Sequence, residues 1–270
     1  MLRARRLIMF SLLAVLSFAP VARSRNSETG FLNRSVKVGA ASYPYQVYVP
    51  SNWTKKKKWP VVLFLHGAGE RGDDGLIQTE VGIGSLIRRH PDRVPAIVVL
   101  PQCAKDRWWS EAEMQSQALK ALDQTMKEFN GDATRVYLTG LSMGGHGSWV
   151  MASNNPGKFA AIVPICGPAR ITNRYGVKVS AELSAEDSYQ KFAQKIGKTP
   201  VWVFHGDADP AVPVTESRLM VEALKAAGGN VRYNEYPGVG HDSWNKAYAE
   251  PELFTWLFSH RLGSTESAKR

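Results

Sequence analysis

The sequence is poor in cysteine and has none of the short motifs that bind structural metals. Its 270 residues include two cysteines, Cys103 and Cys166, and contain neither a C-x-x-C pair nor an H-E-x-x-H segment. A disulfide-stapled scaffold and a zinc site are therefore excluded. A chain of this length buries roughly 70–75% of its unfolded surface, so its core needs no covalent cross-link.

Strong compositional bias is also missing. Hydrophobic residues make up 44% of the chain and charged residues 21%, and no internal repeat or long low-complexity linker occurs. These proportions exclude collagen, a coiled coil and a wholly disordered chain. The length fits one large α/β domain.

The apolar run near the start is too short to hold the chain in a membrane. Residues 1–6 carry three arginines, and residues 7–19 are predominantly apolar. A bilayer core requires about 20 apolar residues. A basic start, a short apolar middle and small residues at Ala22 and Ser24 are typical of a secretory signal peptide. We predict that residues 1–24 are a signal peptide, that the protein is secreted or periplasmic, and that it has no stable membrane anchor; a buried N-terminal helix is the alternative.

Positive charge is in excess, but no nucleic-acid signature accompanies it. The formal net charge of +10 falls to +6 without the four arginines of residues 1–24. Four consecutive lysines at residues 55–58 lie between Trp53 and Trp59. Such a run either holds an anionic surface or forms a solvated loop between strands, the more common case. No finger, recognition helix or RNA-binding motif occurs, so we expect no nucleic-acid partner.

Short apolar runs recur along the chain, bounded by proline or glycine. Residues 35–41 and 46–50 predict an initial hairpin. Continuous apolar runs are typical of strands buried on both faces; they occur at residues 60–65, 96–100, 135–139, 160–165 and 200–204, and an alternating run follows at 231–236. We expect residues 25–33 and 263–270 to be disordered.

Helical periodicity fills the gaps between these runs. Residues 111–129 carry an apolar stripe with steps of three and four, and residues 215–227 repeat it. Pro251 favours a final helix at 252–262. Strands that alternate with helices predict one α/β domain, residues 34–262, with a mostly parallel eight-stranded sheet covered on both faces.

A candidate nucleophile follows the strand at residues 135–139. Gly140, Ser142 and Gly144 form G-x-S-x-G between a strand and an apolar helix, which is the context this motif requires. The sharp turn strains the serine backbone, and the flanking glycines let neighbouring chains approach. The helix N-terminus favours negative charge that develops at the hydroxyl.

A serine hydroxyl needs a base, and the sequence offers several histidines. They are His66, His90, His146, His205, His241 and His260. His241 follows the last strand, on the sheet edge that also carries Ser142, so we predict it to be the base. His66 and His205 each precede glycine at a strand end and are interpreted as turn-shaping residues, and His146 as a packing residue.

Two carboxylates compete to orient this base. Asp207 and Asp209 both follow the strand at residues 200–204, and Asp207, directly after a glycine, could instead brace the loop. Either residue gives the chain order Ser, Asp, His that is expected of an α/β-hydrolase.

These segments resemble α/β-hydrolases of the secreted esterase kind. The chain is similar to phospholipase/carboxylesterase-like and "predicted peptidase" esterases, and more loosely to feruloyl and polyhydroxyalkanoate-depolymerase esterases. The resemblance rests on residues 65–72 (LHGAGERG), 100–103 (LPQC), 108–109 (WW), 140–145 (GLSMGG), 205–213 (HGDADPAVP) and 240–244 (GHDSW). In such families the acid lies in G-x-x-D-x-x-V-P, which implies Asp209 over Asp207.

The resemblance also implies the rest of the site. The oxyanion hole would combine the Met143 N–H with that of Ala68, or of Gly69 in its place. Trp108, Trp109 and Trp244 either line a pocket for an acyl or sugar group or pack in the core. Residues 167–199, where such folds carry a lid, are too few and too polar for a large cap domain.

The sequence therefore predicts a serine esterase with neither metal nor cofactor. Its substrates would be short-acyl or aryl esters, including esters on polysaccharides. A peptidase with the same triad, or a non-catalytic carbohydrate-binding module on this scaffold, is the alternative. The usual strand order of the fold, 1-2-4-3-5-6-7-8, separates Cys103 from Cys166 by three strand positions, roughly 14 Å at about 4.8 Å per strand. Since a disulfide needs Cα atoms within about 7 Å, we expect no bond between them.

Overall fold

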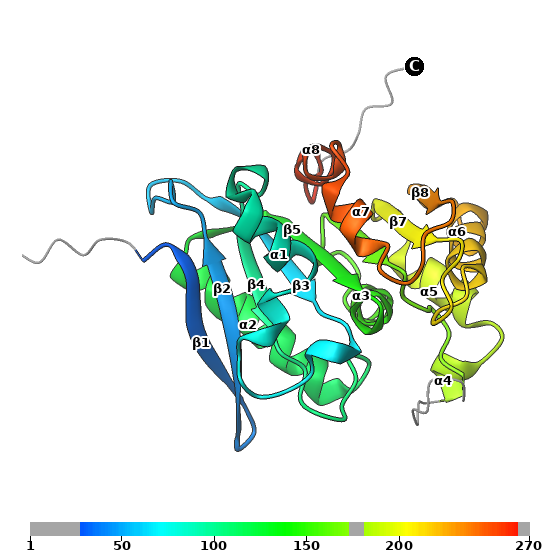
Figure 1. Ribbon diagram of the computed structural model, residues 1–270, viewed down its shortest axis with the longest axis horizontal. Coiled ribbons are helices and arrows are strands. Elements are labelled where there is room, and N and C mark those ends of the chain that lie inside the picture. Colours follow the sequence, from blue (N-terminus) through cyan, green and yellow to red (C-terminus); the bar gives the residue numbers. More distant parts are fainter. Residues whose placement is uncertain (1–27, 173–180, 264–270) are drawn as a thin grey trace, which may run out of the picture.

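A computed structural model describes residues 28–172 and 181–263 (Figure 1). One eight-stranded sheet runs through this part of the chain in the order β1-β2-β4-β3-β5-β6-β7-β8. Its strands are β1 (Gly30–Val38), β2 (Ala41–Val49), β3 (Trp59–Leu65), β4 (Ile97–Pro101), β5 (Gly131–Leu141), β6 (Ala161–Ile165), β7 (Val201–Gly206) and β8 (Val231–Tyr236).

The strand order confirms the predicted α/β-hydrolase fold. β1 pairs with β2 and β2 with β4 in antiparallel register, and every other pairing in the sheet is parallel. The ends of β3, β5, β6, β7 and β8 therefore meet at one edge, which we call the carboxyl edge. The opposite edge, where these strands begin, is the amino edge.

Helices cover both faces of the sheet, as predicted. Successive residues of β3 point to opposite faces: Val61 and Leu63 join one buried cluster, and Val62 and Phe64 the other. The first cluster is covered by α2 (Ala112–Glu128), α3 (Met143–Asn154), α5 (Ser188–Ile196) and α6 (Thr215–Ala226). The second is covered by α1 (Gly82–Arg89), α7 (Trp244–Ala249) and α8 (Leu253–Ser259).

Short helical segments complete the described chain. They are the 3₁₀ turns η1 (Ala68–Glu70), η2 (Ile77–Thr79) and η3 (Pro91–Arg93), and α4 (Ala181–Ser184). α1 and α7 were not predicted, because α1 has glycine at two of its first three positions and α7 has only six residues. No helix in the described ranges is long and apolar enough to cross a bilayer.

The first strand corrects the predicted start of the domain. Gly30 to Asn33, expected to be disordered, lie in β1, and the hairpin turns at Gly39 rather than after residue 41. Phe31 packs on Tyr48 with ring centroids 5.4 Å apart, which holds the strand in place. The predicted signal peptide, residues 25–27 and residues 264–270 lie outside the described residues.

The candidate lid is mostly part of the body. α5 packs against α3 and α6, and Tyr189, Phe192 and Ile196 are buried in the core. The second half of the segment therefore contains a helix that packs on the body of the domain. Residues 173–180 lie outside the described residues. Cys103 and Cys166 are free, buried thiols at the ends of β4 and β6.

Candidate active site

Ser142 stands at the tight turn between β5 and α3. Its backbone has φ 52° and ψ −117°, a conformation that L-residues rarely adopt. The Ser142 N–H donates to the Ile165 carbonyl at 2.9 Å, which ties the turn to the end of β6. Such strain persists only where the surroundings hold it, and it is characteristic of functional positions.

The glycines around Ser142 are required by close backbone approach. A Cβ on Gly144 would lie 1.9 Å from the Leu65 carbonyl oxygen, and one on Gly140 would lie 2.3 Å from the Gly144 carbonyl oxygen. Both neighbours are backbone atoms and cannot move aside. The first turn of α3 is thereby brought against the end of β3, from which the next loop starts.

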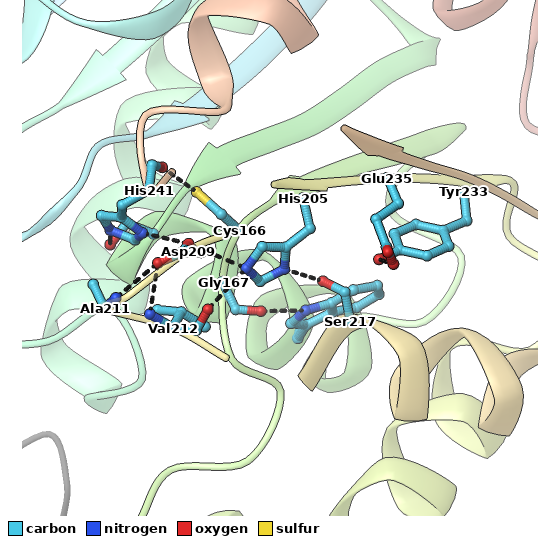
Figure 2. A network of polar contacts seen from close by, with 12 residues as sticks. Cys166, Gly167, His205, Asp209, Ala211, Val212, Ser217, Tyr233, Glu235 and His241 are labelled. Atoms are coloured by element: carbon cyan, nitrogen blue, oxygen red, sulfur yellow. Dashed lines mark hydrogen bonds and ion pairs between the residues drawn. The ribbon is translucent and has the colours of Figure 1, made fainter. Parts of the chain in front are cut away.

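Three side chains predicted from the sequence lie in one hydrogen-bonded row. His241 Nε2 is 2.9 Å from Ser142 Oγ, and His241 Nδ1 is 2.7 Å from Asp209 Oδ2. Because a carboxylate only accepts, Nδ1 carries the proton and Nε2 accepts from the serine hydroxyl. The Asp209 side chain is fully buried, whereas that of His241 is 26% exposed (Figure 2). The row thus begins at the buried Asp209 carboxylate and leads to His241, whose side chain is partly exposed to solvent.

Asp209 rather than Asp207 contacts His241. Burial acts to raise the pKa of Asp209, but N–H donors from His205, His241 and Val212 outweigh it and hold that pKa far below its usual range. Asp207 accepts the Gly238 N–H at 2.7 Å and is exposed. It therefore braces the loop, as the alternative interpretation of that residue held.

The candidate oxyanion donors lie at two helix starts. Met143 is the first residue of α3 and Ala68 the first of η1, so neither N–H has an acceptor within its own helix. Gly67 packs against the serine: a Cβ at that position would lie 3.7 Å from Ser142 Cβ. The loop after β3 is therefore close enough to Ser142 to place an N–H donor beside it.

The three tryptophans differ in their surroundings. Trp108 is half-buried with its ring 6.0 Å from His146, and Trp244 is half-buried with its ring 5.4 Å from His241. Trp109 is fully buried and donates from Nε1 to the His66 carbonyl at 3.0 Å. Of the two interpretations of Trp109, core packing therefore fits its position and pocket lining does not, because the ring is buried against the loop after β3.

His205 is the residue of this site that sequence analysis misjudged. It was interpreted as shaping a turn, yet its Nε2 lies 3.2 Å from Asp209 Oδ2 (Figure 2). Its position four residues before Asp209, at a strand end, was the available signal. Elsewhere at this edge, burial lowers the pKa values of His66 and His146 to about 4, so both rings are neutral at pH 7.

One group of possible metal ligands coincides with this row. Within the described chain, ligand atoms of Cys166, Asp209 and His241 lie within 4.8 Å of one another. Burial raises the pKa of the Cys166 thiol to about 12, and its Sγ contacts the His241 carbonyl at 3.4 Å. A coordinating thiol must lose its proton, so the chemistry of this set fits hydrogen bonding better than metal binding.

The chain resembles known proteins over most of its length. A family described as "Putative esterase" matches residues 40–250. A solved structure titled a thermostable esterase superposes with a TM-score of 0.71 at 33% identity, over 86% of this chain and 63% of that one.

Two curated fungal relatives align over shorter spans. An uncharacterized secreted protein of Arthroderma benhamiae is 30% identical over 70% of this chain and 22% of its own. Acyl-protein thioesterase 1 of Gibberella zeae is 42% identical over 21% of this chain and 24% of its own. The chain thus spans only about a quarter of the length of these relatives. The family match, which covers well over half of the chain, shows that it belongs to this esterase family.

Proposed function

We propose that the protein is an exported serine esterase that hydrolyses short-acyl or aryl carboxylic esters. The observation that carries the proposal is the hydrogen-bonded row Ser142–His241–Asp209, with separations of 2.9 Å and 2.7 Å, at a strained strand-to-helix turn. Nucleophile, base and orienting acid in mutual contact are the arrangement that acyl transfer needs.

The mechanism follows from these positions. Ser142 Oγ attacks the ester carbonyl carbon while its proton passes to His241 Nε2. The tetrahedral oxyanion accepts hydrogen bonds from the Met143 and Ala68 N–H groups. The C–O bond to the alcohol then breaks, and the alcohol leaves with the proton from His241. Water then attacks the acyl carbon while one of its protons passes to His241 Nε2. The bond between the acyl carbon and Ser142 Oγ breaks, Oγ takes that proton back, and the acid is released.

Asp209 keeps the base in its working state. Its carboxylate accepts from Nδ1, which leaves Nε2 free to take the serine proton, and its negative charge stabilises the imidazolium that forms. Because its pKa is held far below the usual range, the carboxylate stays ionised across the physiological range of pH.

The packing of α5 supports small substrates. Tyr189, Phe192 and Ile196 are committed to the core, so this helix offers no loose apolar cover for a long acyl groove. A large uncovered groove would exceed the few hundred Å² of apolar patch that soluble monomers expose. The half-buried rings of Trp108 and Trp244 are flat surfaces suited to aryl groups or to the sugars of an esterified polysaccharide.

Export is supported by the sequence and by one relative. Residues 1–24 have the composition of a signal peptide, and the Arthroderma relative is named a secreted protein. The secreted fraction of cells that express the full sequence should contain protein that begins at Arg25. Retention of residues 1–24 in the cell-associated chain would contradict this part of the proposal.

A serine-directed fluorophosphonate tests the catalytic assignment. Ser142→Ala should abolish labelling and lower kcat on p-nitrophenyl acetate by about 10⁴- to 10⁶-fold. Ser153→Ala is the matched control, because that buried serine on α3 donates only to the Val150 carbonyl. An unlabelled wild-type protein would indicate a non-catalytic binding module, and hydrolysis by Ser142→Ala above a hundredth of wild type would move the nucleophile elsewhere.

Acyl-chain length tests the substrate class. We expect kcat/KM to be highest for p-nitrophenyl acetate or butyrate and lowest for palmitate. A preference for palmitate would replace this proposal with a lipase.

A further inference from the structure

His205 ends β7 with its side chain buried beside the candidate triad acid. The ring has no solvent exposure, and both nitrogens lie within hydrogen-bond distance of partners. Figure 2 shows the Asp209 carboxylate between two imidazoles, with His241 on one side and His205 on the other. The His205 ring hydrogen-bonds to Asp209, Val212 and Ser217 rather than to Ser142, so any effect on the reaction passes through Asp209.

The contacts fix the proton on the His205 ring. Nε2 lies 3.2 Å from Asp209 Oδ2 and 3.1 Å from the Val212 carbonyl oxygen, and both of these atoms only accept. Nε2 therefore carries a hydrogen shared between them. Nδ1 lies 2.7 Å from Ser217 Oγ, whose hydroxyl can donate to it. The two acceptors thus select the tautomer that points an N–H at Asp209, and Ser217 on α6 anchors the other side of the ring.

With this donor, all acceptor positions of the Asp209 carboxylate are used. Oδ1 accepts from the Ala211 and Val212 N–H groups at 2.8 Å and 2.9 Å. Oδ2 accepts from His241 at 2.7 Å and from His205 at 3.2 Å. An ionised carboxylate has about four such positions. The two backbone donors fix Oδ1 alone, so the direction of Oδ2 depends on the two histidines.

We propose that His205 is a positioning residue that holds Asp209 Oδ2 toward His241. The proposal rests on the proposed function, since it assigns a role within that triad. His241 must move slightly as it exchanges protons with Ser142 and the leaving group, so it cannot itself be the fixed reference for the carboxylate. The buried ring of His205, anchored by Ser217 on α6, is that reference.

Two substitutions of His205 by an amide side chain, which should disturb the packing of the ring to a similar extent, distinguish this role from simple packing. The Gln side-chain nitrogen reaches the place of Nε2, so His205→Gln keeps the donor to Asp209. The Asn nitrogen reaches only the place of Nδ1, so His205→Asn keeps a group near Ser217 and loses that donor. We expect kcat on p-nitrophenyl acetate to fall about 10- to 100-fold for Asn and less than about threefold for Gln, with KM within about twofold in both.

A spectroscopic signature accompanies the kinetic one. The proton that His241 Nδ1 donates to Asp209 gives a low-field NMR resonance, which should persist in His205→Gln and broaden or vanish in His205→Asn. Equal kcat losses in the two variants, or an intact resonance in both, would overturn the proposal and leave His205 a packing residue.

Ser142→Ala, measured alongside, distinguishes the two proposals. If Ser142→Ala is inactive and His205→Asn turns over like wild type, the esterase proposal stands and the role of His205 is overturned. If Ser142→Ala still turns over, the proposed triad fails and the role of His205 fails with it. Should His205→Asn not fold, Ser217→Ala removes the contact that anchors the His205 ring, with an expected loss of kcat of about three- to fivefold, above the limit given for His205→Gln.

Discussion

The two edges of one sheet are built in different ways. At the carboxyl edge, Ser142 and Cys166 have positive φ values of 52° and 39°, and buried imidazoles hold the loops together. At the amino edge, the Asn130 side chain donates to two loop carbonyls, and Asp132 pairs with Arg135 at 2.7 Å. At the amino edge Asn130 also has a positive φ, 55°, but asparagine tolerates this conformation, and apart from the buried Asp132 the side chains that hold these loops are exposed or half-buried.

This contrast separates residues for chemistry from residues for stability. The amino-edge contacts lie at or near the surface, so each contributes modestly and can be removed alone. At the carboxyl edge the polar groups share partners, as Asp209 does with two histidines, so the loss of one member changes the others. Substitutions of polar side chains at the carboxyl edge should therefore change activity more than stability, and those at the amino edge should leave activity intact.

The largest expected effect is on turnover at the carboxyl edge. Asp209→Asn should lower kcat by about 10⁴-fold, because an amide at this position no longer holds the His241 tautomer. Asp207→Asn, two residues away, should change kcat less than about threefold, because Asp207 accepts only a loop N–H. Steady-state kinetics on p-nitrophenyl acetate compare the pair, and the reverse ranking would overturn the choice of acid.

The sheet could be predicted from the sequence because its buried strands are continuous runs of apolar residues. The run Pro60 to Leu65 is apolar at every position, and β3 is buried at every position. Where the hydrophobic pattern is weak, the sequence did not predict the helix. α1 begins with Gly82 and has a second glycine, Gly84, because the helix packs closely on the preceding segment: a Cβ on Gly84 would lie 2.3 Å from the Thr79 carbonyl oxygen. Such contacts are made between segments, and no periodicity records them.

The next effect is on stability and compares glycines at the two edges. Gly144→Ala should lower the free energy of unfolding by about 3 kcal/mol or more, because its Cβ would lie 1.9 Å from the Leu65 carbonyl oxygen. Gly157→Ala, at φ +75° with no atom near its Cβ, should cost only about 1–2 kcal/mol for the backbone conformation. Urea unfolding measures both. Equal costs would mean that the turn at Ser142 relaxes easily.

The candidate site shows where residue identity stops being informative. His66-Gly67 and His205-Gly206 look alike in sequence, yet His66 accepts the Cys103 N–H at 2.9 Å while His205 donates to Asp209. Chain order and the G-x-S-x-G turn are enough to predict that Ser142 and His241 lie at one edge. Only tertiary contacts distinguish the two His-Gly pairs, because the hydrogen-bond partners of each histidine come from other segments of the chain.

A smaller effect should appear at the amino edge as the pH falls. Burial acts to raise the pKa of Asp132, but hydrogen bonds from Thr134 and Arg135 outweigh it and hold that pKa at about 2. A folded-state pKa below the unfolded value of about 3.9 gives stability that is present above pH 4 and lost as the pH falls through about 2. Asp132→Asn should therefore cost about 1–2 kcal/mol at pH 7, after allowance for solvent screening, and about half of that at pH 3.

Urea unfolding at the two pH values measures this difference, with kcat at pH 7 as the control. Esterase activity should be unchanged, because Asp132 lies at the start of β5 and Ser142 follows the end of that strand. A cost that does not shrink at low pH would show that the contribution of Asp132 is packing rather than charge. A fall in kcat would break the separation of the two edges.

The smallest effect is expected for the four lysines at residues 55–58, also at the amino edge. Their backbone is held by other residues: Asn130 donates to the Lys55 and Lys57 carbonyls, and Arg135 to the Lys58 carbonyl. The side chains are exposed, apart from a contact of Lys57 Nζ 3.9 Å from the Trp59 ring. Replacing Lys55, Lys56 and Lys58 by Gln should leave the melting temperature within about 2 °C and kcat/KM for p-nitrophenyl acetate within about twofold, because charges on a solvated loop contribute little to folding. A tenfold change in kcat/KM for this neutral ester would mean that the amino edge acts on the site, and the contrast between the two edges would no longer describe this protein.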